Sequence, residues 1–425
     1  MVGSDKSAST IVIGGGIIGV STLYALAKRG VNALLLEQRD ATALETSYAN
    51  GGMLTPSMPD PWNGPGVGGH LLRSLFDPAS AMKLRLKSVP GLAAWGLQFL
   101  SNSRRERHRR ATLANFKLAD YSLAKTDLWR ERENVDCAWS DRGTMKLFSS
   151  TEAMESSLQI ARALEPYGLS FDVLGRDEIL LREPALDPVK DKFACALSYP
   201  EDRSGDCHLF ARGLASAAGL NGASIRTGIG VERIRTKGGA VVGVETTEGF
   251  LAADSVIVAA GCTSPQLAAR CGVSLPIKPA KGYSLSFDVS RVNDRPRLPV
   301  IDDSRHAAIV PIGARIRIAG TAEFAGFDKS LDAARIDNLQ RMLKAVYPTL
   351  ADAVSGDAGE AWVGLRPMSA DGAPFIGETR VSGLWVNSGH GHLGWTLAAG
   401  SAALLADLLL EASPAIDPAP YRIVR

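Results

Sequence analysis

Three glycines in the spacing Gly14-x-Gly16-x-x-Gly19 constrain the fold of this chain more than any other feature. They separate a short apolar run from a predicted helix, and a second apolar run follows that ends at Glu37, 23 positions after Gly14. The first run, the helix and the second run are expected at 10–13, 18–29 and 33–36. Such glycines let a backbone approach a pyrophosphate at the start of a helix, and an acidic residue at this distance reaches a ribose hydroxyl. A tight turn beside an exposed Glu37 would explain neither the spacing nor the acid, so the sequence predicts a β-α-β unit that binds a dinucleotide.

The length and the charge of the chain limit the remaining possibilities. At 425 residues the chain exceeds the roughly 250 to 300 residues at which a single hydrophobic core stops growing, so two domains are expected. Lysine plus arginine number 47 and aspartate plus glutamate 45, which leaves a net charge of only +2. A dedicated nucleic-acid binder carries a clear basic excess. We therefore expect no nucleic-acid partner.

Cysteine usage and hydropathy predict a cytoplasmic protein. The five cysteines are odd in number and scattered without a C-x-x-C pair, which favours a reducing compartment and predicts no metal site. The first apolar cluster, 11–13, follows Asp5 and precedes glycines, unlike the apolar region of a signal peptide. The best candidate for a membrane span, 393–406, has 14 residues, fewer than the roughly 20 that a span needs. This stretch is predicted to be a buried helix.

Between these ends, sheet-rich and helical stretches alternate. Residues 56–69 contain eight prolines or glycines in 14 positions, which predicts an irregular loop that is either a lid or binding loop or a merely mobile connection. Residues 70–135 are predicted to be largely helical and include RRERHRR at 104–110, which is typical of a solvated helix face. Ser149-x-x-Glu152 predicts a capped helix start. Further strands are expected at 144–148, 193–199, within 223–261 together with a hairpin, at 281–287, at 307–319 with a turn at 313–314, and at 384–387.

This order of elements predicts a nucleotide-binding domain in three pieces, interleaved with a substrate domain. The expected fold class is α/β plus α+β, with a discontinuous Rossmann-like domain and a second, sheet-rich domain. The first domain is expected over 1–57, 201–276 and 360–425, and the second over 58–200 and 277–359.

The glycine pattern alone does not distinguish NAD from FAD, but longer stretches do so by resemblance. They are VIGGGIIGV at 12–20, LETSYANGGMLTPS at 44–57, GDCHLF at 205–210, KGYSLS at 281–286, VGLRPMSADGAP at 363–374 and NSGHGHLGWTLAAGS at 387–401. In this order they resemble the FAD-dependent D-amino-acid oxidase-like family, and within it they are most similar to the bacterial D-amino acid dehydrogenases. The resemblance extends over nearly the whole chain and implies noncovalently bound FAD.

Position by position, the resemblance implies which residues contact FAD. Glu37, Gln38 and Arg39 would hold the adenosine ribose, and the backbone of 47–53 would lie along the flavin ring. The start of the C-terminal helix, 391–396, would lie beneath the pyrimidine edge of the flavin, where a helix N-terminus stabilises the negative charge of the reduced ring. The implied cofactor-binding residues are Gly14, Gly16, Ile17, Ile18, Gly19, Glu37, Gln38, Arg39, Ser47, Asn50, Gly51, Gly52, Met53, Val231 at the adenine, Ala260, Gly261, Gly391, His392, Leu393, Gly394 and Thr396.

Arg366, in the stretch GLRP, is the predicted substrate-binding residue. The matching arginine in the family grips the substrate carboxylate, and a planar guanidinium forms two parallel charge-assisted bonds with such a group. The alternative is a structural arginine paired with Asp371 or Glu360. Tyr283 is either a second ligand of the same carboxylate or a core aromatic of its strand. No acid–base role is predicted for the histidines His306, His390 and His392.

The resemblance implies a flavin-dependent oxidative deamination of a D-amino acid. Hydride would pass from the α-carbon to FAD, and water would hydrolyse the resulting imine to a 2-oxo acid and ammonia. An alternative in the same class is the oxidation of a secondary amine or imino acid, such as a glycine derivative, a hydroxyproline isomer or an iminodiacetate-like compound. An NAD-dependent dehydrogenase and a flavin-fold binding subunit without turnover are further alternatives. The absence of a second nicotinamide site and the flavin-like C-terminal stretch argue against the first, and Arg366 together with the cofactor stretches argues against the second.

The resemblance to dehydrogenases also implies a quinone or a similar electron acceptor near a membrane. The arginines of 104–110 would then hold the protein peripherally at the inner face of the cell membrane. The alternative is a solvated helix face in an oxidase without membrane contact. Basic and apolar residues expected to assist at the membrane are Leu71, Leu72, Leu75, Phe76, Lys83, Arg85 and Lys87.

Overall fold

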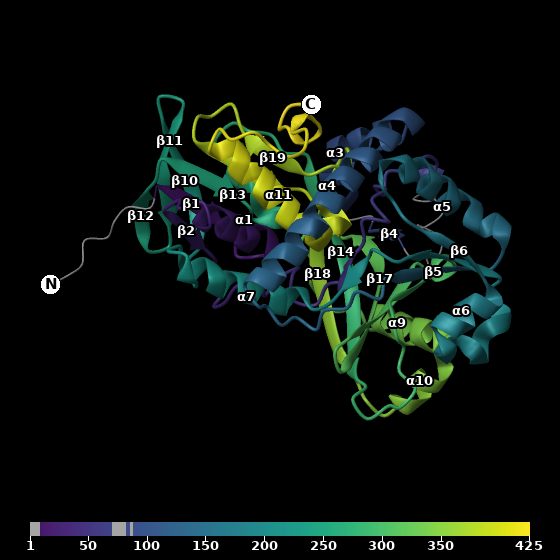
Figure 1. Ribbon diagram of the computed structural model, residues 1–425. Coiled ribbons are helices and arrows are strands. Elements are labelled where there is room, and N and C mark those ends of the chain that lie inside the picture. The colour runs from purple at the N-terminus through teal and green to yellow at the C-terminus, as the bar shows by residue number, and fades with distance from the viewer. Residues whose placement is uncertain (1–8, 70–81, 86–87) are drawn as a thin grey trace.

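The computed structural model describes residues 9–69, 82–85 and 88–425 (Figure 1). Within this part of the chain the strands form sheets of six, nine, three and two strands. The strands are β1 (Thr10–Ile13), β2 (Ala33–Leu36), β3 (Met53–Leu54), β4 (Met82–Leu84), β5 (Thr144–Phe148), β6 (Asp172–Gly175), β7 (Cys195–Tyr199), β8 (Arg203–Ser204), β9 (Ser224–Arg226), β10 (Val231–Lys237), β11 (Ala240–Thr246), β12 (Gly249–Ala252), β13 (Ser255–Val258), β14 (Ile277–Asp288), β15 (Val300–Asp302), β16 (Ala307–Ile312), β17 (Arg315–Phe324), β18 (Glu360–Ser369), β19 (Phe375–Glu378) and β20 (Leu384–Ser388). The helices are α1 (Ile17–Ala27), α3 (Val89–Ser101), α4 (Arg105–Arg132), α5 (Thr151–Leu164), α6 (Arg176–Arg182), α7 (Cys207–Leu220), α8 (Ser264–Ala269), α9 (Ala333–Val346), α10 (Pro348–Ala353) and α11 (Gly394–Leu409).

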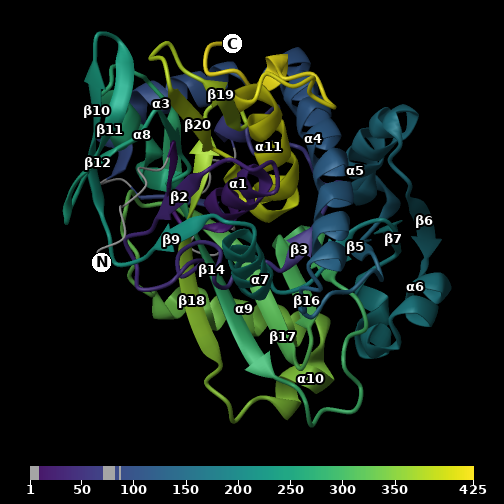
Figure 2. The ribbon, with the colours of Figure 1, turned by 60° about the vertical axis from the view of Figure 1, so that its left-hand side comes forward.

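The smaller, mainly parallel sheet has the strand order β19-β20-β13-β1-β2-β9. β1 and β2 consist almost entirely of apolar residues because both faces of this sheet are covered. On one face, Val12 and Leu35 belong to the core that includes α1, α7 and α11. On the other face, Ile13 and Leu36 pack with the three-stranded sheet β10-β11-β12. Figures 1 and 2 show the resulting layers, with α1 and α11 side by side.

The larger sheet has the order β18-β14-β17-β16-β15-β5-β7-β6, and β4 pairs with β17. Its central strands β14 and β17 are antiparallel and long. On one face, Leu285 of β14 and Ile318 of β17 pack with Leu339 and Leu343 of α9. The other face of these strands is turned toward the parallel sheet, since Ser284 and Arg317 both bond to the loop before β3. Two sheets therefore meet across the residues that the sequence predicts as the site.

Most predicted elements are confirmed. β1, β2 and β5 have the predicted bounds, and the predicted strands at 193–199, 281–287 and 307–319 correspond to β7, to β14 and to β16 with β17. The buried helix is also confirmed: the segment Gly391–Leu409 is long and apolar enough to cross a membrane by length and composition, yet it is mostly buried as the core helix between α1 and α4.

Three details differ from the sequence-based expectations. The cap of α5 is Ser150 and not Ser149, because the Ser150 hydroxyl accepts from the amide of Ala153 at 3.2 Å. β18 lies within the expected first-domain piece 360–425, yet it belongs to the larger sheet because it pairs along β14. The helical stretch 70–135 contains α3 and α4, but also the short strand β4, which forms by pairing with β17. Leu71, Leu72, Leu75, Phe76 and Lys87 lie outside the described residues.

Candidate cofactor and substrate site

A cavity of about 1450 Å³ lies between the carboxyl ends of the parallel strands and the larger sheet. Ordinary small-molecule sites have about 300 to 1,000 Å³, so this cavity has room for a dinucleotide together with a substrate. Among the predicted residues, those in its wall are Gly14, Gly16, Ile17, Ile18, Glu37, Gln38, Ser47, Asn50, Gly51, Met53, Val231, Ala260, Gly261, Tyr283, Arg366, Gly391, His392, Leu393, Gly394 and Thr396. Gly19, Arg39 and Gly52 are not part of this wall.

The glycine loop 14–19 forms an open backbone surface, the glycine cradle, that has no room for side chains at Gly14 and Gly19. Gly14 has a φ of +108°, and a Cβ there would lie 2.7 Å from the carbonyl oxygen of Ala259. A Cβ on Gly19 would lie 1.8 Å from the carbonyl oxygen of Gly14, so Gly19 acts by letting α1 pack against the loop. A Cβ on Gly16 would meet only the Ser47 hydroxyl, at 3.5 Å. That hydroxyl accepts a hydrogen bond from the amide of Ile17 at 2.9 Å. The start of α1 thus lies open to the cavity, where its dipole favours an anion such as pyrophosphate.

Glu37 is fixed at the edge of the cavity by two backbone amides. Its carboxylate accepts from Gly15 at 2.5 Å and from Arg39 at 2.8 Å, and only 8% of the residue is exposed. This geometry holds an acceptor at the end of β2, where a ribose contact is predicted. The Arg39 side chain instead turns outward to Glu45, with Nε and Oε1 2.7 Å apart.

The segment 47–53 is braced by the larger sheet. Ser284 donates to the carbonyl of Ala49 at 2.7 Å, and Arg317 donates to the carbonyl of Asn50 at 3.0 Å. Burial lowers the pKa of Arg317, which is 2% exposed. Sequence reasoning missed this arginine, and no local pattern in the chain reveals it, because it reaches the loop across the domain boundary. The brace holds Asn50, Gly51 and Met53 in the cavity wall.

The start of α11 forms the opposite wall. The Thr396 hydroxyl accepts from the amide of Thr55 at 3.1 Å, which ties this helix to the loop after β3. Burial lowers the pKa of His390 to about 3 and that of His392 to about 4. Both imidazoles are therefore neutral at pH 7, as expected for residues without an acid–base role. His306 also lies in the cavity wall.

Arg366 enters the cavity without a carboxylate partner among the described residues. The ion pair considered as an alternative is wrong, because Asp371 pairs with Arg425 at 2.6 Å and Glu360 accepts from Tyr48 at 3.0 Å. Burial lowers the pKa of Arg366 to about 10, and it remains a cation at pH 7. A partly buried cation without a counter-charge is costly, so the site is complementary to an anion brought by a ligand.

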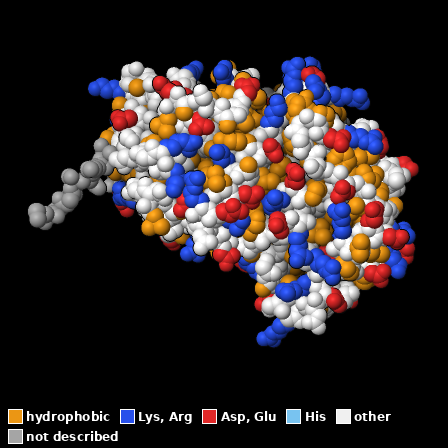
Figure 3. All heavy atoms as spheres, in the orientation of Figure 1, with side chains coloured by type: hydrophobic (Ala, Val, Ile, Leu, Met, Phe, Trp, Pro, Cys, Tyr) orange, Lys and Arg blue, Asp and Glu red, His pale blue; other side chains and the backbone are white. Residues whose placement is uncertain are grey.

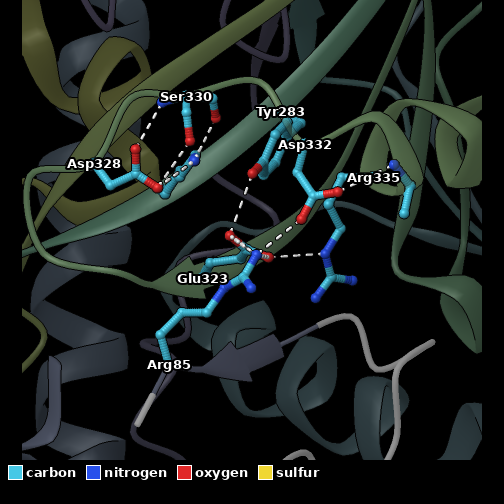
Figure 4. A network of polar contacts seen from close by, with 9 residues as sticks. Arg85, Tyr283, Glu323, Asp328, Ser330, Asp332 and Arg335 are labelled. Carbon is cyan, nitrogen blue, oxygen red and sulfur yellow. Dashed lines mark hydrogen bonds and ion pairs between the residues drawn. The ribbon is translucent and has the colours of Figure 1, made fainter. Parts of the chain in front are cut away.

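Tyr283 belongs to the cavity wall, but its hydroxyl points away from Arg366's side of the sheet. Successive side chains of a strand face opposite sides, and Arg366 occupies the space beside Gly282, the neighbour of Tyr283. Figure 4 shows Tyr283 pointing to Glu323, to which it donates at 3.2 Å, with Arg85 and Arg335 on the same carboxylate. Burial and then Glu323 raise the pKa of Tyr283. The geometry favours a core aromatic, and a contact with substrate stays a prediction.

Sequence reasoning missed Trp62 in the loop 56–69. Its ring lies over the guanidinium of Arg366, 5.5 Å from Cζ to the ring centroid, and stacks on His392 at 5.2 Å between centroids. The proline and glycine content of the loop indicated a binding loop as one alternative, and the structure supports that alternative. The composition could not identify which loop residue faces the cavity.

Fold and cavity together define a dinucleotide-dependent enzyme whose cofactor site opens onto a pocket for an anionic substrate. The family model described as FAD dependent oxidoreductase matches residues 9–408, and the chain belongs to this family. The glycine cradle, the fixed Glu37 and the start of α11 are the features that would hold the pyrophosphate, ribose and flavin of FAD. The residues of the cavity therefore fit this cofactor.

Named relatives and solved structures agree with this assignment. The chain is 38% identical over 420 residues to a D-amino acid dehydrogenase of Cereibacter sphaeroides, which covers 98% of this chain and 94% of that protein. It is 37% identical to a D-amino acid dehydrogenase of Bradyrhizobium diazoefficiens, with 98% of both chains covered. Glycine oxidase from Geobacillus kaustophilus has a similar structure, with a TM-score of 0.75, 25% identity and 98% of both chains covered. Iminodiacetate oxidase from Chelativorans sp. BNC1 shares the fold at 21% identity, with a TM-score of 0.73 and coverage of 97% and 98%.

The purified protein is expected to be yellow and to release its flavin on denaturation. Cys262 is the cysteine in the cavity wall, and burial raises the pKa of its thiol to about 12, so it is not a nucleophilic thiolate at pH 7. After acid precipitation, about one FAD per chain should remain in the supernatant. A yellow pellet would contradict noncovalent binding, and a colourless protein that binds NAD would contradict the choice of cofactor.

Proposed function

We propose that the protein oxidises the Cα–N bond of a D-amino acid, giving an imine that water hydrolyses to a 2-oxo acid and ammonia. The observation that carries this proposal is Arg366, a partly buried cation in the cavity wall without a carboxylate partner among the described residues. Its planar guanidinium suits a carboxylate, which every amino acid supplies. The named D-amino acid dehydrogenases of similar sequence support the choice of substrate class.

The chain's own residues orient the substrate and exclude water. FAD, when bound, supplies the acceptor for the hydride. Arg366 holds the carboxylate, which fixes the α-carbon relative to the loop 47–53 and the start of α11. His390 and His392, with pKa values of about 3 and 4, are poor general bases near pH 7. Productive binding therefore depends on a substrate that presents its amine uncharged.

An anaerobic substrate screen tests the proposed function. The flavin-loaded protein is mixed with single D-amino acids, their L-enantiomers, and secondary amines such as sarcosine and iminodiacetate, and loss of the flavin absorbance is followed. We expect D-amino acids to bleach the flavin fastest. Faster bleaching by a secondary amine would show that the substrate class is secondary amines and not D-amino acids. If none of the tested compounds bleaches the flavin, the proposed function is wrong.

The electron acceptor is proposed to be a quinone-type compound, with the protein in peripheral contact with a membrane at the cytoplasmic side. Arg104, Arg105, Arg107, Arg109 and Arg110 are exposed at the start of α4. The exposed Leu97 and Leu100 of α3 precede them in the chain. Figure 3 shows Lys and Arg side chains gathered beside hydrophobic ones over this region. A basic side chain near an anionic surface contributes about 1 kcal/mol, so this basic face supports such a contact.

This contact makes a prediction for vesicle binding. The protein should co-sediment with anionic vesicles at low salt and be released as the salt concentration rises, because ions screen the attraction. The double variant Arg104→Glu, Arg105→Glu should bind several-fold more weakly, while Arg291→Glu, Arg295→Glu, at an exposed site far along the chain, should bind normally. Absence of binding at low salt would reject the contact. Fast reoxidation of the flavin by air, with little activity on quinone analogues, would reject the acceptor.

A further inference from the structure

Trp62 stands between two residues of the cavity wall. Its ring stacks on that of His392, with centroids 5.2 Å apart and planes inclined by 18°, and the Cζ atom of Arg366 lies 5.5 Å from its centroid. Burial keeps His392 neutral, as its pKa of about 4 indicates, so the stack contains a single cation. Trp62 is therefore the aromatic contact of the unpaired guanidinium.

The loop around Trp62 is fixed on both sides. Nε2 of His108 lies 3.1 Å from the carbonyl oxygen of Pro61, and Asn63 donates to the carbonyl of Ala370 at 3.1 Å. Further contacts hold the neighbouring residues: Asn115 Nδ2 donates to the carbonyl of Pro59 at 3.0 Å, the Ser57 hydroxyl donates to Asp202 at 2.5 Å, and Pro61 packs where a Cβ on Gly372 would lie at 2.3 Å. Residues from three separate parts of the chain, in α4, at Asp202 and at 370–372, thus hold the loop around Trp62 in place.

The other restraints on Arg366 are weak by comparison. Its hydrogen bond to the carbonyl of Thr321 measures 3.4 Å, longer than the roughly 2.7 to 3.2 Å of ordinary N–H···O bonds. Gly282 contacts the guanidinium through its backbone alone, since a Cβ there would lie 2.1 to 2.5 Å from Nη1, Cζ and Nη2. No carboxylate of the described residues pairs with this arginine. The ring of Trp62 is thus the side-chain contact of the guanidinium that a substitution can remove.

We propose that Trp62 is a positioning residue that orients Arg366 toward the carboxylate of a small amino acid. The inference rests on the proposed function. Stacking uses the face of a guanidinium and leaves its N–H groups free at the edge. A carboxylate binds those edge groups through two parallel bonds, whose strength depends on the plane of the guanidinium. Loss of the ring therefore weakens carboxylate binding without removing the charge.

The test compares four variants with the wild type, all loaded with FAD. Trp62→Leu and Trp62→Met remove the ring, and Trp62→Phe keeps a smaller one. Trp139→Leu is the matched control, because Trp139 is also partly buried and lies 5.1 Å from Cζ of Arg130, but outside the cavity wall. The probe is propionate, which has a carboxylate and no amine, and its binding is followed through the flavin spectrum.

We expect the dissociation constant of propionate to rise about tenfold in Trp62→Leu and Trp62→Met and about threefold in Trp62→Phe. A cation–π contact of ordinary strength gives changes of this size. Trp139→Leu should bind propionate like the wild type, even if its melting temperature falls. With a substrate from the screen, the ring-less variants should raise KM about tenfold and change kcat less than threefold.

Unchanged propionate binding in flavin-loaded Trp62→Leu or Trp62→Met would overturn the proposal. If Trp62→Leu and Trp62→Met both lose FAD, Trp62→Phe provides the test. An unchanged dissociation constant of propionate in Trp62→Phe would then overturn the proposal. A wild type that binds no propionate would also overturn it. If the wild type binds propionate but no amine bleaches its flavin, the proposed function fails while weaker binding in the Trp62 variants still supports the role of Trp62.

Discussion

Replacement of Arg366 by alanine is expected to lower kcat/KM for the amino-acid substrate by about 30- to 4,000-fold, while FAD stays bound. Truncating one partner of a desolvated, hydrogen-bonded charge pair costs about 2 to 5 kcal/mol, and about 1.4 kcal/mol corresponds to a tenfold change in rate. Asp371 and Glu360 are engaged elsewhere, so the partner proposed for Arg366 is the carboxylate of the substrate. Steady-state kinetics and the flavin content of the variant give the measurement.

Replacing Arg366 should leave the folding stability unchanged or raise it, although it lowers the catalytic efficiency. Because the folded-state pKa is lowered to about 10, burying the cation opposes folding at neutral pH, and this cost disappears only as the pH rises above the folded pKa toward the unfolded one. Arg366→Met should therefore melt at the same or a higher temperature than the wild type in the absence of substrate.

A contrasting arginine provides the control for this stability effect. Arg335 is 4% exposed and pairs with Glu323 at 2.9 Å. Arg335→Met leaves that carboxylate without one of its cations and should lower the melting temperature. If Arg366→Ala kept near-normal turnover, or if Arg366→Met destabilised the protein as much as Arg335→Met, the carboxylate assignment would be wrong.

Replacement of Gly19 by alanine is expected to abolish FAD binding and to destabilise the fold strongly. The added Cβ would lie 1.8 Å from the carbonyl oxygen of Gly14, and this contact is with backbone, which no side-chain rotation relieves. The start of α1 must then move away from the loop, and the pyrophosphate loses its amides and dipole. Flavin content, and thermal unfolding with added FAD, measure the effect.

Gly219→Ala is the matched control, because Gly219 also lies in a helix but has open space at its Cβ. Alanine is the better helix former by up to about 1 kcal/mol, so this variant should be neutral or slightly stabilising. A Gly19→Ala protein that keeps one FAD per chain would refute the close packing of α1 on the loop.

The sequence predicted the parts of the site that depend on local pattern. The strand, loop and helix at 10–29 follow from the period of the apolar residues and from glycine spacing, and their observed bounds agree to within two residues. Arg366 was predicted from a longer stretch of resemblance, and it lies in the cavity. These signals are contained in contiguous residues.

The remaining parts depend on contacts between distant segments. The side on which Tyr283 lies follows from its register against β17, which shifts between Gly282 and Tyr283. The placement of Trp62 depends on His108, Asn63 and their distant partners. Neither the register nor these contacts leave a periodic trace in the chain, so sequence reasoning left Tyr283 undecided and did not name Trp62.

The brace from Ser284 and Arg317 to the loop 47–53 couples cofactor affinity to the integrity of the larger sheet. A ligand that binds only the folded chain raises its stability by mass action, and here the stabilised loop is attached to both sheets. Added FAD should therefore delay the unfolding of both halves together. Conversely, damage to β14 or β17 should appear first as flavin loss, even when the glycine cradle itself is intact.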